Sequence, residues 1–278
     1  MKSIFRCIVK FFIYLMIILC ILLFYAHFVE PNLLVKTEYT VQAPSPVQEC
    51  KIVYFSDTHF GSLYDQEHFT RIVKKINSQN PDIVVFGGDL LDNYARDRED
   101  LDLDFISSKL NEISPASEKF AVYGNHDYGG GASRVYSDLM ESGGFTVLKN
   151  TSLLLEEYNI RMVGYDDYLL GSTEDSHYQI SEEDFTILLS HEPDVAQFIS
   201  LPRTGVMLAG HSHGGQVSLP FLTERNLPTG ATMYVEGDYP DCGVSANISL
   251  YVSRGIGMTV LPFRFLNPPE IMVLHIKN

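Results

Sequence analysis

Cysteine is scarce in this chain. Only four cysteines occur among 278 residues, and two of them, Cys7 and Cys20, lie in or beside an apolar N-terminal run. The other two, Cys50 and Cys242, either pair with each other or remain free thiols, but two residues do not make a disulfide framework. Neither has the spacing of a thiolate metal site. The sequence therefore argues against a small disulfide-stapled scaffold and against a cysteine-based metal site.

Basic side chains are also few. Lys and Arg number 20 against 35 Asp and Glu, which gives a formal net charge of −15. The imbalance grows when Lys2, Arg6 and Lys10, which precede the apolar run, are set aside. A domain this acidic repels nucleic acids and anionic bilayers. The composition therefore argues against a nuclease without sequence preference, and we expect no nucleic-acid partner.

Only one stretch stays apolar for long enough to cross a membrane. Residues Phe11 to Val29 carry no formally charged side chain, and as a helix they would be about 28 Å long, close to the hydrocarbon thickness of about 30 Å. The run is longer than the apolar core of a signal peptide, and the residues after it offer no small-x-small cleavage site. We therefore expect an uncleaved, single-pass anchor.

The charges on either side of this run predict its orientation. Three basic residues precede it and Glu30 follows it, so the positive-inside rule places the N-terminus in the cytoplasm. The expected parts of the chain are a cytoplasmic N-terminus with the membrane anchor (1–30), a linker with an edge strand (31–49) and a main domain outside the cytoplasm (50–278).

Short β-rich runs alternate with helix-like segments from Lys51 onward. The runs KIVYF, DIVVF and KFAVY each end in a polar loop. Apolar residues recur at helical spacing over 65–78 and 101–113. Because this βαβα order builds a sheet with crossover helices, ligand-binding groups should gather at the carboxyl ends of the strands. Later β-rich runs, among them ATMYVEG at 231–237, have fewer helices between them and indicate a second, mixed sheet.

Side chains of the metal-ligand type follow these predicted strands. They are Asp57, His59, Asp89, Asn125, His126, Asp127, His191, His211 and His213. Taken singly, such an aspartate could cap a helix and such a histidine could pack in a core. Together, carboxylate, amide and imidazole groups from five loops suit a borderline divalent ion such as manganese, iron or zinc. His211 and His213 stand two apart in GHSHGG, so in extended backbone both rings face one point.

These blocks resemble the signature of the calcineurin-like metallophosphoesterases. That signature, D-x-H, G-D, G-N-H-D/E, H and G-H-x-H, is matched in order from Asp57 to His213. The stretches SDTHFG, GHSHGGQV, SRGIG and LPFRF are similar to the membrane-anchored bacterial branch that contains YkuE-like and YaeI-like phosphoesterases. The resemblance implies a four-layer α/β/β/α sandwich of two mixed sheets flanked by helices, here behind an N-terminal transmembrane helix.

The resemblance also implies a role for each matching residue. Two divalent ions would be held, one by Asp57, His59 and His213, the other by Asn125, His191 and His211, with Asp89 as the bridge. His126 would contact the phosphate and protonate the leaving oxygen or stabilise charge, and Asp127 would orient it. A pair of cations about 3.5–4 Å apart neutralises phosphate charge and lowers the pKa of a water. An acidic protein can bind an anionic substrate in this way.

Three features allow two interpretations each. Asp92 is either an acceptor for a ligating histidine or a helix cap. Arg254 either binds substrate phosphate or is an ordinary surface arginine. The glycine-rich segment 128–133 is either a mobile rim of the site or the turn before the next helix.

The expected function is that of a monomeric, membrane-anchored phosphoesterase with two metal ions. The branch implies phosphodiester or pyrophosphate bonds in lipid-linked or envelope molecules, such as UDP-diacylglucosamine-like glycolipids. Lipid-precursor hydrolases of this type work at the cytoplasmic face, whereas the charge bias places this domain outside, so the two inferences conflict. The rival interpretations are a metal-free scaffold on the same fold, which would have lost ligand residues, and a nuclease of the same superfamily.

Overall fold

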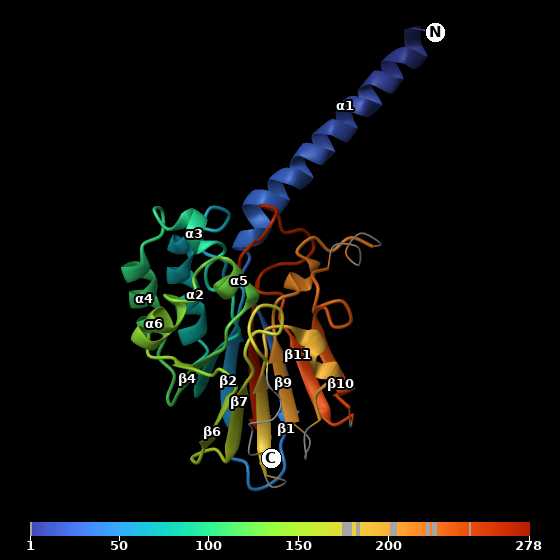
Figure 1. Cartoon of the computed structure of the whole chain (residues 1–278). Helices are drawn as coiled ribbons and strands as arrows, with labels where there is room; N and C mark the ends of the chain where they lie inside the picture. The colour runs from blue at the N-terminus through green and yellow to red at the C-terminus, as the bar shows by residue number, and fades with distance from the viewer. Residues whose placement is uncertain are drawn as a thin grey trace.

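Two six-stranded sheets form the body of the protein, and a long N-terminal helix leaves one end of it (Figure 1). The computed structural model describes residues 2–173, 180, 181, 184–200, 205–220, 223, 227–244 and 246–278. The first sheet has the order β1 (Val35–Gln42), β12 (Glu270–Lys277), β2 (Cys50–Phe55), β3 (Ile83–Phe86), β4 (Lys119–Ala121) and β5 (Thr146–Val147). The second has the order β10 (Gly237–Cys242), β11 (Ile248–Val252), β9 (Gly205–Ala209), β8 (Phe185–Leu189), β7 (Ile160–Gly164) and β6 (Thr151–Leu155).

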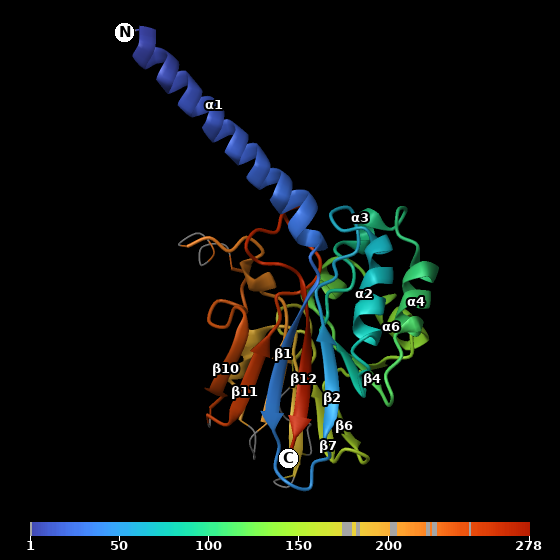
Figure 2. The same ribbon diagram turned by 180° about the vertical axis from the view of Figure 1, so that it is seen from behind.

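Helices cover the outer face of the first sheet. The helices on this side are α2 (Phe69–Asn77), α4 (Leu103–Glu112) and α6 (Tyr136–Ser142) (Figure 2). The short helices α3 (Tyr94–Asp97) and α5 (Asn125–Gly129) follow strands β3 and β4 (Figure 1). The outer face of the second sheet packs against a 3-10 helix, η4 (Pro193–Gln197), through Val195 and Ala196. The predicted fold class is confirmed, and so are the two helices expected within 65–78 and 101–113.

Successive residues of the central strands alternate between two cores. In β2, Val53 and Phe55 pack under the helices, whereas Ile52 and Tyr54 face the second sheet and meet residues such as Leu208. Every residue of β3 is buried, because a parallel strand in the middle of a sheet is covered on both faces. The two sheets are therefore held together by an apolar layer.

The strand directions bring the loops that follow them to one end of the domain. β2, β3, β4 and β5 are parallel to one another, and so are β7, β8, β9 and β11. A hydrogen bond from the His211 amide, after β9, to the Asp57 carboxylate, after β2, joins the carboxyl ends of the two sheets. This is also the end at which the N-terminal helix meets the domain (Figure 1).

One predicted strand is displaced. The run 231–237 was expected to be β-structure, but the strand of this region is β10, which begins at Gly237. The backbone amides of Thr232, Met233 and Tyr234 donate instead to the Asp194 carboxylate. Because these donors are satisfied by a side chain, they are not available to a sheet ladder.

The N-terminal helix ends against the domain. α1 (Lys2–Phe24) continues through a π-helical turn, η1 (Tyr25–Val29), and a 3-10 turn, η2 (Glu30–Asn32). Residues 3–32 together are long and apolar enough to cross a membrane by length and composition. The Ala26 carbonyl accepts from the Arg264 amide at 2.9 Å, and the Glu30 carboxylate accepts from the Asn267 amide. Strand β1 follows and lies at the edge of the first sheet, beside β12.

Candidate metal centre

Sharp backbone turns after the strands direct the candidate ligands toward one another. Asp57, His59, Asp89, His211 and His213 all have positive φ, between 43° and 66°. This left-handed conformation costs a non-glycine residue roughly 1–2 kcal/mol, so five instances in one cluster are a feature that the surrounding fold must enforce. Space is equally tight, because a Cβ on Gly210 would lie 2.4 Å from Asp57 Oδ2. The glycine therefore permits the close approach of the loop expected from the sequence.

Asp57, His59 and His213 form the first ligand group. His213 Nε2 lies 3.6 Å from Asp57 Oδ1 and 3.0 Å from His59 Nε2. Two ring nitrogens that face each other at this distance have one hydrogen to share at most when both rings are neutral. A cation between them and the carboxylate would satisfy all three groups.

Asp89, His191 and His211 form the second group. His191 Nδ1 lies 2.8 Å from the Gly87 carbonyl oxygen, which leaves Nε2 as the nitrogen directed at Asp89 Oδ2, at 3.1 Å. His211 Nε2 lies 2.9 Å from the Thr229 carbonyl oxygen, which leaves Nδ1 for a ligand. A carbonyl on the far nitrogen is the usual way in which a protein fixes the tautomer of a metal-binding imidazole.

Asp89 lies between the two groups. Its Oδ2 is 3.1 Å from His191 Nε2 and 3.4 Å from His59 Nε2, while its Oδ1 accepts from the His126 amide at 2.8 Å. Asn125 begins helix α5 beside it, and the Asn125 Oδ1 atom is buried without a hydrogen-bond partner. The structure thus brings together six of the seven residues that the sequence assigns to metal binding, and the seventh, Asn125, directly precedes His126, whose amide donates to Asp89.

His126 stands at the edge of this cluster. Its side chain is 29% exposed, against 5% or less for His59, His191 and His213. Its Nδ1 lies 2.7 Å from the Asp92 carbonyl oxygen, so that this nitrogen carries the proton and Nε2 is left for a reaction partner.

Asp92 contacts both histidines on this side of the cluster. Its Oδ1 lies 3.3 Å from His59 Nδ1 and 3.5 Å from His126 Nδ1. Arg96 pairs with its Oδ2 at 2.7 Å. Of the two interpretations of Asp92, the structure supports the acceptor for a candidate ligand histidine.

Asp127 has a different place from the one expected. Its carboxylate accepts hydrogen bonds from three backbone amides, those of Gly124, Asp89 and Leu90, at 2.9–3.1 Å. Adjacent residues of a helix point in different directions, so Asp127 turns inward while His126 faces the cluster. The contacts that orient the His126 ring come from Asp92, and Asp127 instead joins the loops after β3 and β4.

Burial and mutual charge set the protonation of the cluster. Burial and the neighbouring His191 lower the pKa of His211 to about 4, and burial holds the pKa of His213 well below its usual value. Burial opposes ionisation of Asp89, but His191 and His126 outweigh it and hold the pKa of Asp89 well below its usual range. Neutral imidazoles and an ionised carboxylate are the forms that bind metal ions. His191 differs from His211 and His213, because burial opposes a rise in its pKa but Asp89 outweighs burial and holds the pKa of His191 well above its usual value, so this ring would give up its proton on binding a metal ion.

Two residues that contact His213 were not predicted from the sequence. Arg264 is fully buried, with Nη2 at 3.3 Å from His213 Nδ1 and hydrogen bonds to the carbonyls of Gly257 and Arg254. Asn267 Nδ2 donates to the His213 carbonyl at 2.7 Å. The sequence signal was slight, namely a single arginine within the apolar stretch LPFRF.

The Arg254 side chain forms an ion pair with Glu270. Its Nη2 pairs with Glu270 Oε2 at 2.6 Å, and its amide donates to Glu270 Oε1 at 2.9 Å. Burial opposes a rise in the pKa of Arg254, but Glu270 outweighs it. A role in phosphate binding therefore remains a prediction that must compete with this ion pair.

The residues of the cluster fit divalent metal ions. Asn125 Oδ1 is a buried polar atom without a hydrogen-bond partner, and such an atom is costly unless an unseen group satisfies it. The donors are carboxylate and amide oxygens and imidazole nitrogens, which suit manganese, iron or zinc.

Comparisons with known proteins identify the family of this chain. The family described as calcineurin-like phosphoesterase matches residues 50–228. The uncharacterized metallophosphoesterase YkuE of Bacillus subtilis is 37% identical over 265 residues, covering 91% of this chain and 89% of its own length. Phosphodiesterase YaeI of Escherichia coli is 26% identical over 231 residues, covering 81% of this chain and 82% of its own length. A dimetal phosphatase structure from Danio rerio aligns with a TM-score of 0.47 and 14% identity over 77% of this chain and 89% of that one.

The fold and the cluster define a metal-dependent hydrolase of phosphate esters. The chain belongs to the calcineurin-like phosphoesterase family, and its similarity to YkuE and YaeI confirms the branch that the sequence indicated. The clustered histidines and aspartates, in a member of this family, support a binuclear divalent metal centre.

Proposed function

We propose that this protein is a membrane-anchored phosphoesterase that hydrolyses phosphodiester or pyrophosphate bonds of lipid-linked or envelope substrates outside the cytoplasm. The observation that carries the proposal is that the ligand residues follow the carboxyl ends of the strands, and this is the end of the domain where α1 enters and where helix α5 lies (Figure 1). Asn267 joins the two, since its side chain donates to the His213 carbonyl and its amide to the Glu30 carboxylate. A site beside the anchor is suited to substrates that are themselves held in the bilayer.

The proposed metal ligands follow the two groups described above. Asp57, His59 and His213 would hold one ion, Asn125, His191 and His211 the other, and Asp89 would be shared. Two such metal ions, when bound, supply positive charge for the phosphate and make a water molecule more acidic. The protein's own contribution is to exclude bulk water from these buried side chains and to fix their tautomers through the Gly87 and Thr229 carbonyls.

His126 is the proposed proton donor. Burial opposes its protonation, but Asp89 and the Asp92 carbonyl outweigh burial and raise the pKa of His126. Because Nδ1 is held by the Asp92 carbonyl, the proton available to a leaving oxygen is the one on Nε2. Asp92 is the positioning residue, since it touches both His126 and His59.

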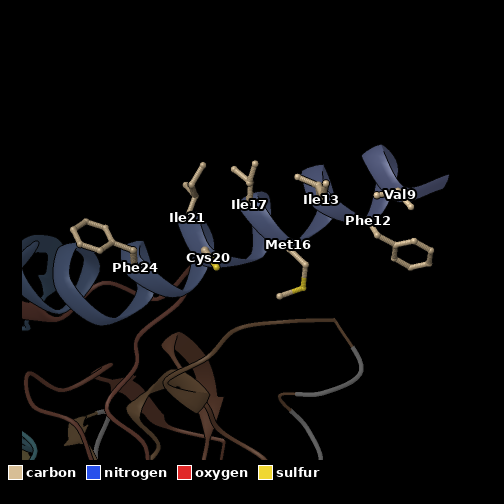
Figure 3. Close-up of a pocket in the computed structure, with 8 residues that line it drawn as sticks. All are labelled: Val9, Phe12, Ile13, Met16, Ile17, Cys20, Ile21 and Phe24. Carbon is tan, nitrogen blue, oxygen red and sulfur yellow. The ribbon is translucent and has the colours of Figure 1, made fainter. Parts of the chain in front are cut away.

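The proposal of a membrane anchor is based on the exposed apolar surface of α1. Figure 3 shows side chains from Val9 to Phe24 projecting from this helix, and none of its most apolar window is buried against the domain. A helix of this composition is stable in a bilayer, where its backbone groups are satisfied internally.

Metal dependence and substrate class are tested together. We expect the purified full-length protein, offered phosphodiesters, phosphomonoesters, lipid pyrophosphates and nucleic acid, to cleave lipid-linked phosphodiesters or pyrophosphates best. Chelation should abolish turnover, and manganese, iron or zinc should restore it, with elemental analysis approaching two ions per chain. Turnover that survives complete metal removal would contradict the proposal, and a preference for nucleic acid would favour the nuclease interpretation.

The orientation of the domain is tested with a reporter at the C-terminus. Because Lys2, Arg6 and Lys10 precede the apolar run and Glu30 follows it, a reporter that works only after export should be active and one that works only in the cytoplasm should be silent. A matched fusion in which the three basic residues are replaced by glutamine should weaken this bias. The opposite reporter pattern would place the site in the cytoplasm and favour a lipid-precursor substrate.

A further inference from the structure

An apolar loop stands at the base of the anchor. Residues 259–266, here called the anchor-side loop, carry Val260, Leu261 and Leu266, which are 85%, 52% and 63% exposed. In Figure 1 the loop rises beside the lower end of α1. A group of exposed apolar residues in one loop usually marks a contact surface.

The backbone of the anchor-side loop is held from within the domain. Gln216 Nε2 donates to the carbonyls of Thr259 and Leu261, at 3.1 Å and 2.8 Å, and Gln216 Oε1 accepts from the Thr259 amide at 2.9 Å. The β-branched Val260 has a φ of 62°, a conformation that persists only where the surroundings enforce it. The polar backbone groups next to Val260 are thus satisfied inside, which is the condition for its side chain to enter an apolar medium.

The same loop is fixed to the helix. The Arg264 amide donates to the Ala26 carbonyl at 2.9 Å, and His27 Nδ1 lies 2.6 Å from the Pro262 carbonyl oxygen. The rings of Tyr25 and Phe265 meet edge to face with centroids 6.4 Å apart. Since the loop is packed on the last turns of the helix, the bilayer surface from which that helix emerges lies beside the loop, whichever side of the membrane the domain occupies.

We propose that the anchor-side loop is a second membrane contact, which inserts Val260, Leu261 and Leu266 into the lipid interface. The proposal rests on the membrane anchoring by α1 proposed above. Apolar insertion is the contact open to this domain, because its net negative charge repels anionic lipid. The partner is therefore the apolar boundary of the bilayer, and the contact does not need charged lipids.

The contact sets the distance between the metal centre and the membrane. Thr259 Oγ1, next to Val260, donates to Asp92 Oδ1 at 3.2 Å, and Asp92 touches His59 and His126. A loop inserted at Val260 therefore holds the cluster directly beneath the lipid headgroups, where a phosphate bond of a lipid-linked substrate is within reach without leaving the bilayer.

Tryptophan fluorescence tests the contact directly, because the chain contains no tryptophan. The probe variant is Val260→Trp in the full chain, reconstituted in zwitterionic vesicles with and without lipid brominated along its acyl chains. The matched control is Val244→Trp, which is 68% exposed in the turn before β11 and so at the opposite end of the domain. Ile17→Trp, within α1, reports the anchor itself.

We expect Val260→Trp to emit at shorter wavelength than Val244→Trp and to be quenched by brominated lipid, most strongly when the bromines lie near the headgroups. Ile17→Trp should be quenched most by bromines deep in the bilayer. Quenching at Ile17 without quenching at Val260 would overturn the loop contact and leave the anchor standing. No quenching at Ile17 would overturn the anchor and the loop contact with it. A blue shift at Val260 that brominated lipid does not quench would show contact with another copy of the chain and would also overturn the proposal.

Discussion

Asp89→Asn should abolish turnover and remove bound metal in the same step. Asp89 faces both ligand groups, at 3.1 Å from His191 and 3.4 Å from His59, so the loss of its charge weakens both ions together. Loss of an outer partner of a metal ligand costs about 10–100-fold in affinity, and loss of the shared carboxylate should cost more. Elemental analysis and turnover on the same preparation measure the two effects.

The matched control for this change is Asp241→Asn. Asp241 has φ 58°, against 59° for Asp89, but it is exposed. Asparagine tolerates the left-handed backbone at both positions, so neither variant should fail to fold for conformational reasons. Asp241→Asn should keep full activity and metal content. An Asp89→Asn protein that retains two ions per chain would contradict the shared role of this carboxylate.

His126→Ala should lower turnover by about 10² to 10⁴ while the metal content stays near that of the wild type. The expected loss is the usual contribution of a general acid, and the metal is spared because His126 lies at the edge of the cluster, with its ring held by Asp92. The measurement is turnover per metal-loaded, folded molecule.

His275→Ala is a suitable control, since the His275 side chain is 32% exposed, close to the 29% of His126, and it lies on β12 away from the cluster. It should leave turnover unchanged. If His126 were only a packing residue, His126→Ala would lose thermal stability with little change in turnover per folded molecule. Turnover of His126→Ala at the wild-type level would reject His126 as the proton donor, and the hypothesis of two metal ions would stand.

The ligand cluster could be predicted from the sequence because its residues lie in short, recognisable sequence blocks. Each candidate ligand follows a strand in a short block such as SDTH or GHSHGG, and parallel strands deliver such blocks to one edge. The two sheets could be predicted for the same reason. β3 and β9 are continuous apolar runs, and β2 and β8 each have a single polar residue, Lys51 or Thr186, among apolar ones.

The contacts that support the cluster could not be predicted from the sequence. They join residues far apart in the chain, or they depend on the direction in which a side chain leaves its helix. Arg264 contacts His213, which is 51 positions away in the chain, and the residues around Arg264 do not indicate that contact. Asp127 follows His126 directly, which suggested a pair, but the turn of helix α5 separates their directions and leaves Asp92 in contact with the ring. The strand expected at 231–237 failed because Asp194, far earlier in the chain, takes the backbone donors of that run.

The pairing of β1 with β12 constrains how the protein acquires its shape. Strand β1, the first strand after the N-terminal helix, pairs with β12, and the Thr37 hydroxyl donates to the Glu270 carboxylate across 233 positions. β12 also fills the place between β1 and β2, so the edge strand β1 has no neighbour in the first sheet until that late segment is made. Long-range pairing of this kind is slow. The newly made chain therefore has unpaired strand edges for a period in which it depends on protection from aggregation.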